Sequence, residues 1–468
     1  MNKNINRLMI VLVLSLSIIT ACKKGQDVQT STTISTPTPT PVAVDPDKVK
    51  DTVLLDSKDI YLWYNQIPSS FNARSYADPS AIMTAIQQYS IEPGFAAPVD
   101  KWSFAMKKTD WDNLSGGLGA TFSASGTASG DFGLGVFFYA EGDLRVKSVE
   151  KESPAGLAGI HRSWRILKIN GNTNITTSNS SFIVDGVFKS TSSTFTFQKP
   201  DGSSVDITLN AAHYQEHPVY LDTVYTINSK KIGYLVFNSF LGDTTEIYNR
   251  FQQVINHFTT AGVNDVVVDL RYNGGGYVTV QEKLANYLVR ASANHNLMMK
   301  QQYNDKYQSY NTTTYFNKAG SLNLSRIFFI VSSGTASASE LLINNLKPYM
   351  DVELIGPSAT HGKPVGFFPI PVGEWYIFPV SFRSTNASGT GNYFNGLAVN
   401  SKAADGINKD WGDVSESSLA SAIKYITSGS FRTLSDETFQ EQLPQVITGN
   451  VTLDRPSFKG TIDPRKLK

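Results

Sequence analysis

A serine, a lysine and a run of glycines in this sequence together have the chemistry needed for acyl transfer. Ser337 lies in the small-residue stretch SSGTASASE, and Lys363 follows a Gly/Pro/Ser turn beyond a predicted helix and strand. A serine hydroxyl is a good nucleophile only when a base takes its proton, and a lysine is that base only when burial lowers its pKa. Gly362 and Pro364 flank Lys363 and bring no carboxylate to hold the ammonium form. The pattern therefore predicts a Ser–Lys nucleophile and base pair on neighbouring loops.

Two alternatives for these residues stay open at the level of sequence. Ser337-Ala-Ser-Glu340 also fits a capping box, in which Ser337 would only cap the following helix and Glu340 would reach back. His361 stands two residues before Lys363 and is an alternative base.

The glycines Gly274, Gly275 and Gly276 follow an apolar strand in DLRYNGGGYV. Glycine lets backbone N–H groups approach a ligand closely, so this turn is a candidate anion nest able to stabilise an oxyanion. The alternatives are a simple turn at a strand end or a phosphate loop, but neither nucleotide-binding motif is matched. Asp269 and Arg271 are compatible with structural support, and the sequence assigns no role to either.

Alternating strands and helices must position these residues. The strands and helices expected around them are Ile232–Phe237, Thr245–Thr259, Val266–Leu270, Phe328–Val331, Ser339–Met350, Val352–Ile355 and Glu416–Tyr425. Alternation of this kind predicts a layered α/β core, which we place at residues 212–430. Residues 47–115 carry helical spacing and predict a small helical N-terminal domain, with one helix at 79–89. Residues 431–468 are expected to be a loosely packed C-terminal tail.

Residues 116–211 change to short alternating strands with glycine and serine turns. Their order, with the phrase VEKESPAGLAGIHRSWRILKING, resembles a bacterial PDZ domain. The family usually has Gly-Asp where this chain has Ser163-Trp164, so the turn is altered. PDZ domains bind extended peptide termini by strand addition. The resemblance places the groove near Leu134 and Gly135.

DLRYNGGG, then GTASASE, then a Gly-Lys pair behind a PDZ-like segment resembles the C-terminal processing (tail-specific) serine proteases. The resemblance implies a multidomain α/β fold with a crotonase-like protease core, a β-rich PDZ-like domain and the helical N-terminal piece. It makes Ser337 the nucleophile and Lys363 the base. It also implies that the backbone N–H groups of Gly275 or Gly276 and of Ala338 hold the oxyanion. Many members have a glutamine four residues after the lysine to orient the amine, and here that residue is Phe367.

The N-terminus predicts export and a lipid anchor. Residues 1–22 read as a signal peptide ending in Ile19-Thr20-Ala21-Cys22, which resembles a bacterial lipobox and would make Cys22 the lipidated first residue. Residues 23–46 are rich in Thr, Ser and Pro and are expected to form a disordered tether. The expected location is the cell envelope, on the periplasmic or outer-surface side of a bacterial membrane. A signal peptide cleaved elsewhere is the alternative.

Composition and the remaining motifs limit the partners. Among 468 residues, 41 are basic and 40 acidic, and without a basic stripe nucleic acid is not an expected partner. His213, Glu216 and His217 match the HxxEH zinc pattern. That pattern requires a long helix, which Pro218 directly after it prevents. No metal or organic cofactor is expected.

We therefore expect a serine endopeptidase that acts on protein or peptide substrates through their unstructured C-terminal tails. A catalytically impaired peptide-binding lipoprotein is the alternative, and a hydrolase of small esters or envelope material is a third possibility.

Overall fold

The computed structural model describes residues 45–119, 130–431, 453 and 458–466. The predicted signal peptide, Cys22 and nearly all of the tether lie outside these residues. Within the described part of the chain, no helix combines the length and apolar character needed to cross a membrane.

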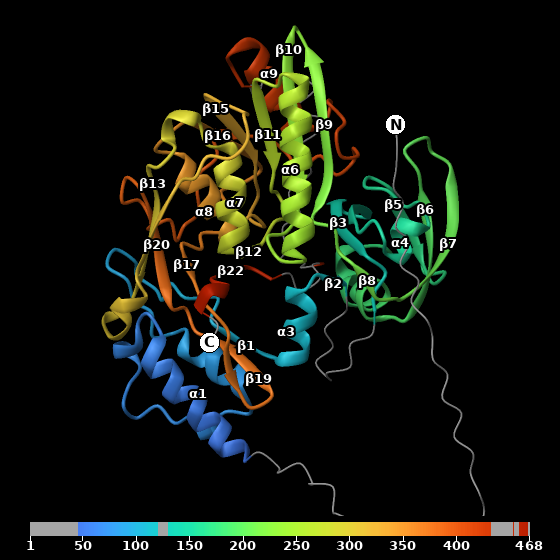
Figure 1. Ribbon diagram of the computed structural model, residues 1–468. Helices are drawn as coiled ribbons and strands as arrows, with labels where there is room; N and C mark the ends of the chain where they lie inside the picture. The colour runs from blue at the N-terminus through green and yellow to red at the C-terminus, as the bar shows by residue number, and fades with distance from the viewer. Residues whose placement is uncertain (1–44, 120–129, 432–452, 454–457, 467–468) are drawn as a thin grey trace, which may run out of the picture. The chain divides into compact units, whose positions relative to one another are not determined.

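A six-stranded sheet forms the centre of the α/β core (Figure 1). Its strands, in spatial order, are β21 (Ser401–Lys402), β16 (Asp351–Gly356), β15 (Arg326–Ile330), β11 (Asp265–Asp269), β10 (Lys230–Phe237) and β9 (Val219–Ile227). Neighbouring strands are parallel except for the β9–β10 pair, which is antiparallel. Every residue of β11 is buried, as expected for a parallel strand covered on both faces.

Helices cover both faces of this sheet. The four long helices of the core are α6 (Thr244–Ala261), α7 (Val278–Leu288), α8 (Ala338–Leu346) and α9 (Ser417–Ser428). On β11, Val266 and Val268 belong to the same hydrophobic cluster as α6, α7 and α8, whereas Val267 belongs to the cluster that contains α9. Because successive side chains of a strand point to opposite faces, α9 lies on the face opposite the other three helices.

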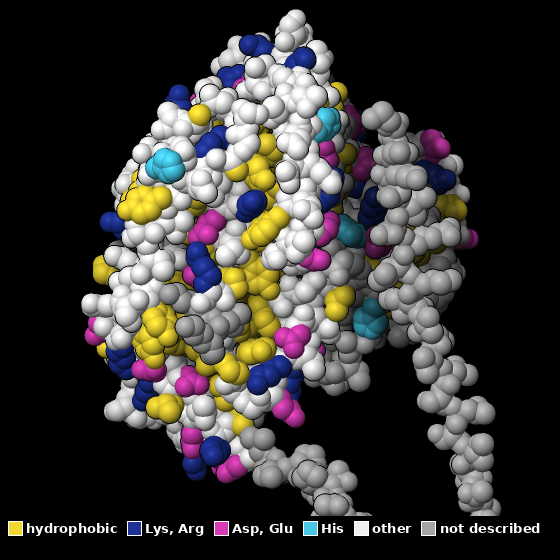
Figure 2. Space-filling model, viewed as in Figure 1, with side chains coloured by type: hydrophobic (Ala, Val, Ile, Leu, Met, Phe, Trp, Pro, Cys, Tyr) yellow, Lys and Arg dark blue, Asp and Glu magenta, His cyan; other side chains and the backbone are white. Residues whose placement is uncertain are grey.

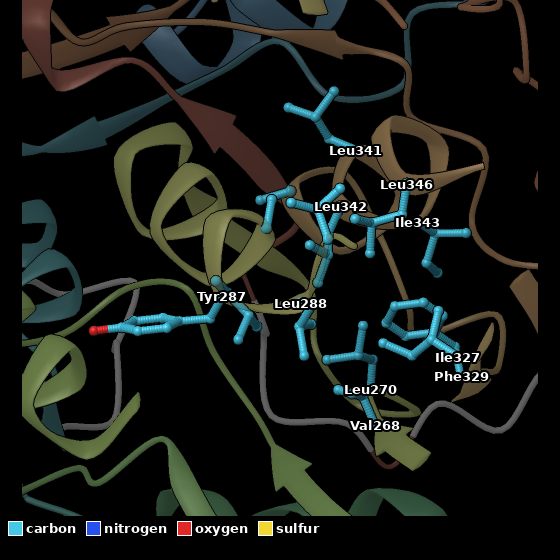
Figure 3. Close-up of a cluster of buried hydrophobic side chains, with 14 of the residues drawn as sticks. Val268, Leu270, Tyr287, Leu288, Ile327, Phe329, Leu341, Leu342, Ile343 and Leu346 are labelled. Atoms are coloured by element: carbon cyan, nitrogen blue, oxygen red, sulfur yellow. The ribbon is translucent and has the colours of Figure 1, made fainter. Parts of the chain in front are cut away.

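The core side chains fix the position of α8, the helix that follows Ser337. Figure 3 shows Leu341, Leu342, Ile343 and Leu346 of α8 beside side chains of β11, β15 and α7. All nine residues of α8 are buried, which leaves this helix little freedom to move relative to the sheet.

Residues 130–212 contain a five-stranded antiparallel sheet. Its strands, in spatial order, are β3 (Leu134–Ala140), β4 (Asp143–Val149), β5 (Arg165–Ile169), β6 (Ser192–Gln198) and β7 (Ser204–Asn210). The short helices α4 (Pro154–Leu157) and α5 (Ser180–Val184) accompany it. Among the described strands, β3 stands at the edge. Ser163 adopts a φ of 79°, the left-handed conformation for which the resembled family uses glycine.

The N-terminal region contains the expected helices but is not a separate helical domain. It holds α1 (Pro46–Ile60), α2 (Pro79–Ile86), α3 (Lys108–Ser115) and strand β1 (Phe104–Lys107). Strand β1 pairs with β19 (Trp375–Phe378), which in turn pairs with β18 (Ile370–Val372). The expected boundary at residue 115 therefore does not divide the packing, because β1 completes a sheet with strands from the core.

Further short strands border the core. The strands β14 (Thr312–Tyr315), β13 (Leu297–Tyr303), β20 (Phe382–Asn386) and β17 (Val365–Gly366) form one sheet, and β2 (Leu118–Gly119) pairs with β8 (Tyr214–Gln215). Strand β12 (Gly275–Tyr277) pairs with β22 (Gly460–Ile462), which is drawn in red in Figure 1.

The expectation of a loosely packed tail is wrong for this last segment. Gly460, Thr461 and Ile462 are buried and paired to β12. A three-residue strand inserted between partners distant in sequence has no periodicity of its own, so the sequence pattern did not reveal it.

Candidate active site

Ser337 lies directly before α8 in a strained backbone conformation. Its φ is 59° and its ψ is −107°, and its side chain is fully buried. A residue with a Cβ at such angles costs about 1–3 kcal/mol and persists where the surrounding structure enforces it. Here the Ala336 N–H and the Ser339 hydroxyl, on either side of Ser337, both donate to the carbonyl oxygen of Asn273, each at 3.0 Å. The loop before α8 is thereby fixed to the glycine turn.

The carboxylate of Glu340 joins the Ser337 loop to the Lys363 loop. Its Oε2 accepts the backbone N–H of Ser337 at 2.7 Å and that of Lys363 at 2.9 Å. Its Oε1 accepts the Thr360 hydroxyl and the Gly362 N–H, each at 2.6 Å. Burial raises the pKa of Glu340, while these hydrogen bonds oppose that rise. Since one oxygen binds both amides, Ser337 and Lys363 are neighbours in the structure.

The Glu340 half of the predicted capping box is therefore present, but it does more than cap a helix. The Ser337 hydroxyl forms a hydrogen bond with the hydroxyl of Thr461. Sequence reasoning treated capping and catalysis as alternatives, whereas here the reaching-back glutamate also orients the loop of the proposed base.

Lys363 is buried with its amine in an aromatic environment. The side chain is 1% exposed, and its Nζ lies 3.7 Å from the centre of the Phe367 ring and 5.7 Å from that of Trp102. The Nζ donates to the carbonyl oxygen of Lys459 at 2.9 Å. Burial lowers the pKa of Lys363 well below its ordinary value, and the carboxylates of Asp100 and Glu340 offset only part of this effect. A lysine in these surroundings favours the neutral amine that a base requires.

His361 is held in a different role. The indole Nε1–H of Trp102 donates to His361 Nε2 at 2.9 Å, so the lone pair of that nitrogen is engaged. Burial, with contributions from the positive charges of Lys459 and Lys363, lowers the pKa of His361 to about 4. A nitrogen whose lone pair is engaged and whose pKa is so low is a poor general base.

The glycine turn lies against the Ser337 loop. A Cβ on Gly275 would stand 3.0 Å from the Ala338 nitrogen and 2.4 Å from the Gly460 carbonyl oxygen, so only glycine fits here. The Gly275 N–H donates to the side-chain oxygen of Asn273 at 2.9 Å. The N–H of Gly275 is therefore engaged within the turn in this structure. Gly276, with a φ of 141°, and Ala338 remain the candidate oxyanion donors.

Arg271 lies in a buried ion cluster. Its guanidinium forms ion pairs with Asp269 at 2.7 Å, Asp405 at 2.9 Å and Glu416 at 3.0 Å. The carbonyl oxygen of Arg271 accepts a hydrogen bond from the hydroxyl of Ser332, at the start of the Ser337 loop. The cluster therefore supports the loop through its backbone.

The HxxEH residues do not form a helix. Tyr214 and Gln215, between His213 and Glu216, form strand β8, and His217 pairs with Glu152 and Glu246. Within the described ranges, no group of three or more His, Cys, Asp or Glu residues is arranged to hold a metal ion.

Sequence reasoning missed the residues that complete this site from far along the chain. Trp102 lies far before Lys363 in the sequence, and Thr461 and Lys459 belong to the segment that was expected to be a loosely packed tail. Nothing in the local sequence around these residues signals such contacts. The one available signal was Phe367 in place of the family glutamine, which left three interpretations open: another group holds Lys363, the site is assembled only on substrate binding, or activity is reduced.

Comparison with known proteins agrees with the arrangement of the core. Residues 231–390 match the model of peptidase family S41. The carboxy-terminal processing protease CtpB of Bacillus subtilis is 24% identical over 280 residues, which cover 59% of this chain and 54% of the relative. The probable CtpA-like serine protease of Staphylococcus saprophyticus is 27% identical over 247 residues, covering 52% of this chain and 47% of the relative. The matches thus span about half the length of these curated relatives.

The fold has a counterpart among solved structures. A crystal structure of a Bacteroides fragilis protein assigned to the S41 proteases aligns with a TM-score of 0.64 and 23% identity. The alignment covers 81% of this chain and 97% of that chain. The multidomain α/β fold expected from the sequence is therefore confirmed.

Proposed function

We propose that this chain is a serine peptidase in which Ser337 is the nucleophile and Lys363 the general base. The similarity of residues 231–390 to peptidase family S41 supports the reaction class. The observation that carries the assignment is the shared carboxylate of Glu340, which holds the backbone amides of Ser337 and Lys363 on one oxygen. A buried serine and a buried lysine of lowered pKa thus occupy adjacent loops.

The proposed reaction uses groups of this chain and one water molecule. Neutral Lys363 takes the proton of the Ser337 hydroxyl as its oxygen attacks the peptide carbonyl, and the Gly276 and Ala338 amides stabilise the oxyanion. Lys363 then gives that proton to the leaving amine, which departs as the new N-terminus. Water attacks the acyl-enzyme ester, Lys363 takes its proton, and the serine hydroxyl is regenerated by return of that proton. The proposed steps require no metal or organic cofactor.

The five-stranded domain is proposed to be PDZ-like and to receive unstructured peptide tails. Its strand β3, which contains Leu134 and Gly135, stands at the edge of the described sheet. An edge strand can pair with an extended peptide, which is how the resembled domains bind their ligands. The substrates proposed are accordingly protein or peptide chains with accessible C-terminal tails.

Attachment to a membrane through a lipid on Cys22 is also proposed, from the lipobox-like sequence alone. Metabolic labelling with a palmitate analogue in a bacterial host should label the parent and not Cys22→Ser. Equal labelling of both would exclude this anchor.

Cleavage of casein and of quenched fluorescent peptides tests the dyad. We expect Ser337→Ala and Lys363→Ala each to lower kcat/KM by about 10³-fold or more, because either change removes the activated nucleophile. Ser358→Ala and Lys402→Ala make the same changes outside the site and should retain activity. His361→Gln should retain measurable cleavage.

Two outcomes would overturn this assignment. Cleavage that survives both Ser337→Ala and Lys363→Ala would place the chemistry elsewhere, with His361 as the next candidate. Binding of peptides with no cleavage by any form of the chain would favour the catalytically impaired peptide-binding protein.

A further inference from the structure

The segment from Phe458 to Asp463 occupies the proposed active site as an added β-strand. On one side β22 runs parallel to β12, with Gly460 opposite Gly275 and Thr461 opposite Gly276. On the other side the Phe367 N–H donates to the Thr461 carbonyl oxygen at 3.0 Å. The segment therefore bridges the glycine turn and the residue that covers Lys363.

The same segment contacts both proposed reactive groups. The Thr461 hydroxyl is hydrogen-bonded to the Ser337 hydroxyl, and the Lys459 carbonyl accepts the amine of Lys363. The Gly460 carbonyl oxygen lies beside Gly275, near the Ala338 amide. With a side-chain hydroxyl on Ser337 and a carbonyl oxygen on the Lys363 amine, the strand engages both proposed reactive groups.

Side chains anchor the strand at both ends. The Phe458 ring lies 5.7 Å from the Trp111 ring and 6.1 Å from the Phe367 ring, centre to centre, and Ile462 is fully buried in the same cluster. Figure 2 shows hydrophobic side chains gathered on the face where Figure 1 draws β12 and β22. Aromatic contacts of this kind add to the stabilisation that burial gives, so the segment is specifically held.

A further residue of the tail lies in the five-stranded domain. Leu453 is 2% exposed and belongs to the hydrophobic cluster of that domain, together with Leu134 of the edge strand β3. The described residues of the tail thus contact both the domain proposed to receive peptide tails and the proposed catalytic groups.

We propose that the C-terminal segment 458–466 is an intramolecular inhibitor that occupies the substrate groove of this peptidase. The groove binds an extended peptide by strand addition between β12 and Phe367, with an aromatic side chain against Trp111. The inference rests on the proposed function for its inhibitory role. A substrate must displace the tail, which belongs to the same chain and therefore competes as an intramolecular ligand.

The full-length chain with Ile462→Asp tests this inhibition. A carboxylate in place of a fully buried side chain disfavours the inserted strand, so kcat/KM on a quenched fluorescent peptide should rise about tenfold or more. Leu157→Asp makes a similar change at a position that is 79% exposed, and its activity should equal that of the parent. Hydrogen exchange of residues 458–463 should be faster in Ile462→Asp than in the parent.

A synthetic peptide of residues 458–465, FKGTIDPR, tests the groove itself. It should inhibit Ile462→Asp competitively and inhibit the parent much more weakly. A fluorescent form should bind the double variant Ser337→Ala/Ile462→Asp, and this anisotropy measurement does not depend on catalysis. Binding without cleavage by any form would therefore retain the strand groove while rejecting the peptidase.

The inference is overturned by either of two results. One is a folded Ile462→Asp chain, by circular dichroism, that is no more active than the parent. The other is failure of the peptide to bind the double variant while hydrogen exchange shows that its own tail has been released.

Discussion

The amine nitrogen of Lys363 lies 3.7 Å from the centre of the Phe367 ring. In the family that the sequence resembles, many members have at this position a glutamine that orients the amine through a hydrogen bond. A phenyl ring offers only a weak acceptor, but it excludes water from the amine. Burial is the largest influence that lowers the pKa of Lys363. Phe367 thus contributes to the burial of the amine, while a carbonyl oxygen accepts its hydrogen bond.

Removing this ring should change the pH dependence of cleavage. In Phe367→Ala, water reaches the amine, the pKa of Lys363 rises toward its ordinary value, and the acidic limb of kcat/KM moves to higher pH. Each unit of that movement lowers activity about tenfold on the limb. Phe378→Ala removes a ring of the same cluster that lies 5.7 Å from Phe367, and it should lower stability without moving the limb. A limb that stays in place in Phe367→Ala would show that the ring does not set the pKa.

The buried lysine should also make stability depend on pH. Because the pKa of Lys363 is lowered in the folded chain, the unfolded chain keeps the proton up to higher pH. Between the folded pKa and the ordinary value of 10.5, unfolding takes up a proton, so the free energy of unfolding falls as pH is lowered. Lys363→Met should therefore be more stable than the parent at pH 7, and the gain should shrink as pH rises toward 10.5.

Urea unfolding of both chains between pH 7 and pH 10 measures this difference. Lys168→Met, at an exposed position, controls for the loss of one positive charge. A stability gain of the same size at every pH would assign the effect to packing and not to protonation.

Glu340 should support both stability and catalysis. Glu340→Gln keeps the shape but replaces one oxygen with an N–H₂ group, which cannot accept the amides that the carboxylate accepts. We expect a loss of about 2–4 kcal/mol in the free energy of unfolding and a large fall in kcat, since both loops lose their common partner. Urea unfolding and steady-state kinetics measure the two effects. Glu353→Gln, a buried glutamate of β16, should cost less and leave kcat unchanged.

The elements around the site were predictable because their signals are local. The apolar strand before Gly274, the small residues around Ser337 and the turn before Lys363 all carry their pattern in a few neighbouring residues. The strand observed at β11 differs from the predicted one by a single residue at each end. In such segments the residues that the apolar pattern marks are the ones that become buried, so the pattern alone is sufficient to predict the element.

The other residues of the site could not be predicted, because their positions depend on contacts between segments that are distant in the sequence. In the sequence, Trp102 cannot be told apart from an aromatic residue of the core. The segment KGTID near the C-terminus is too short and too polar to predict a buried strand. Both become informative only when the fold places them against Lys363 and Ser337. Likewise, Glu340 was visible as a capping residue, but its contact with the Lys363 loop requires the turn to fold back onto α8.

Arg271 provides a test of the buried ion cluster behind the nucleophile loop. Its guanidinium is 2% exposed and pairs with Asp269, Asp405 and Glu416, so Arg271→Met leaves buried carboxylates without this partner. Breaking a buried pair from one side costs about 3–5 kcal/mol, and we expect a loss of that size at neutral pH. Arg250→Met removes a more exposed pair with Asp222 and should cost about 1 kcal/mol or less.

The pH dependence of the stability lost in Arg271→Met distinguishes a lost charge interaction from a lost packing contact. Burial alone would raise the pKa of Asp405, but the guanidinium groups of Arg162 and Arg271 outweigh it and lower the pKa to about 2. This depressed pKa stabilises the folded parent at pH values above the ordinary aspartate pKa of 3.8, and the contribution is lost as pH falls from there toward 2. The difference between parent and Arg271→Met in urea unfolding should therefore narrow below about pH 4. A difference that is constant down to pH 3 would mean that Arg271 acts through its volume and hydrogen bonds, because a lost charge interaction must fade as its carboxylate partners take up protons.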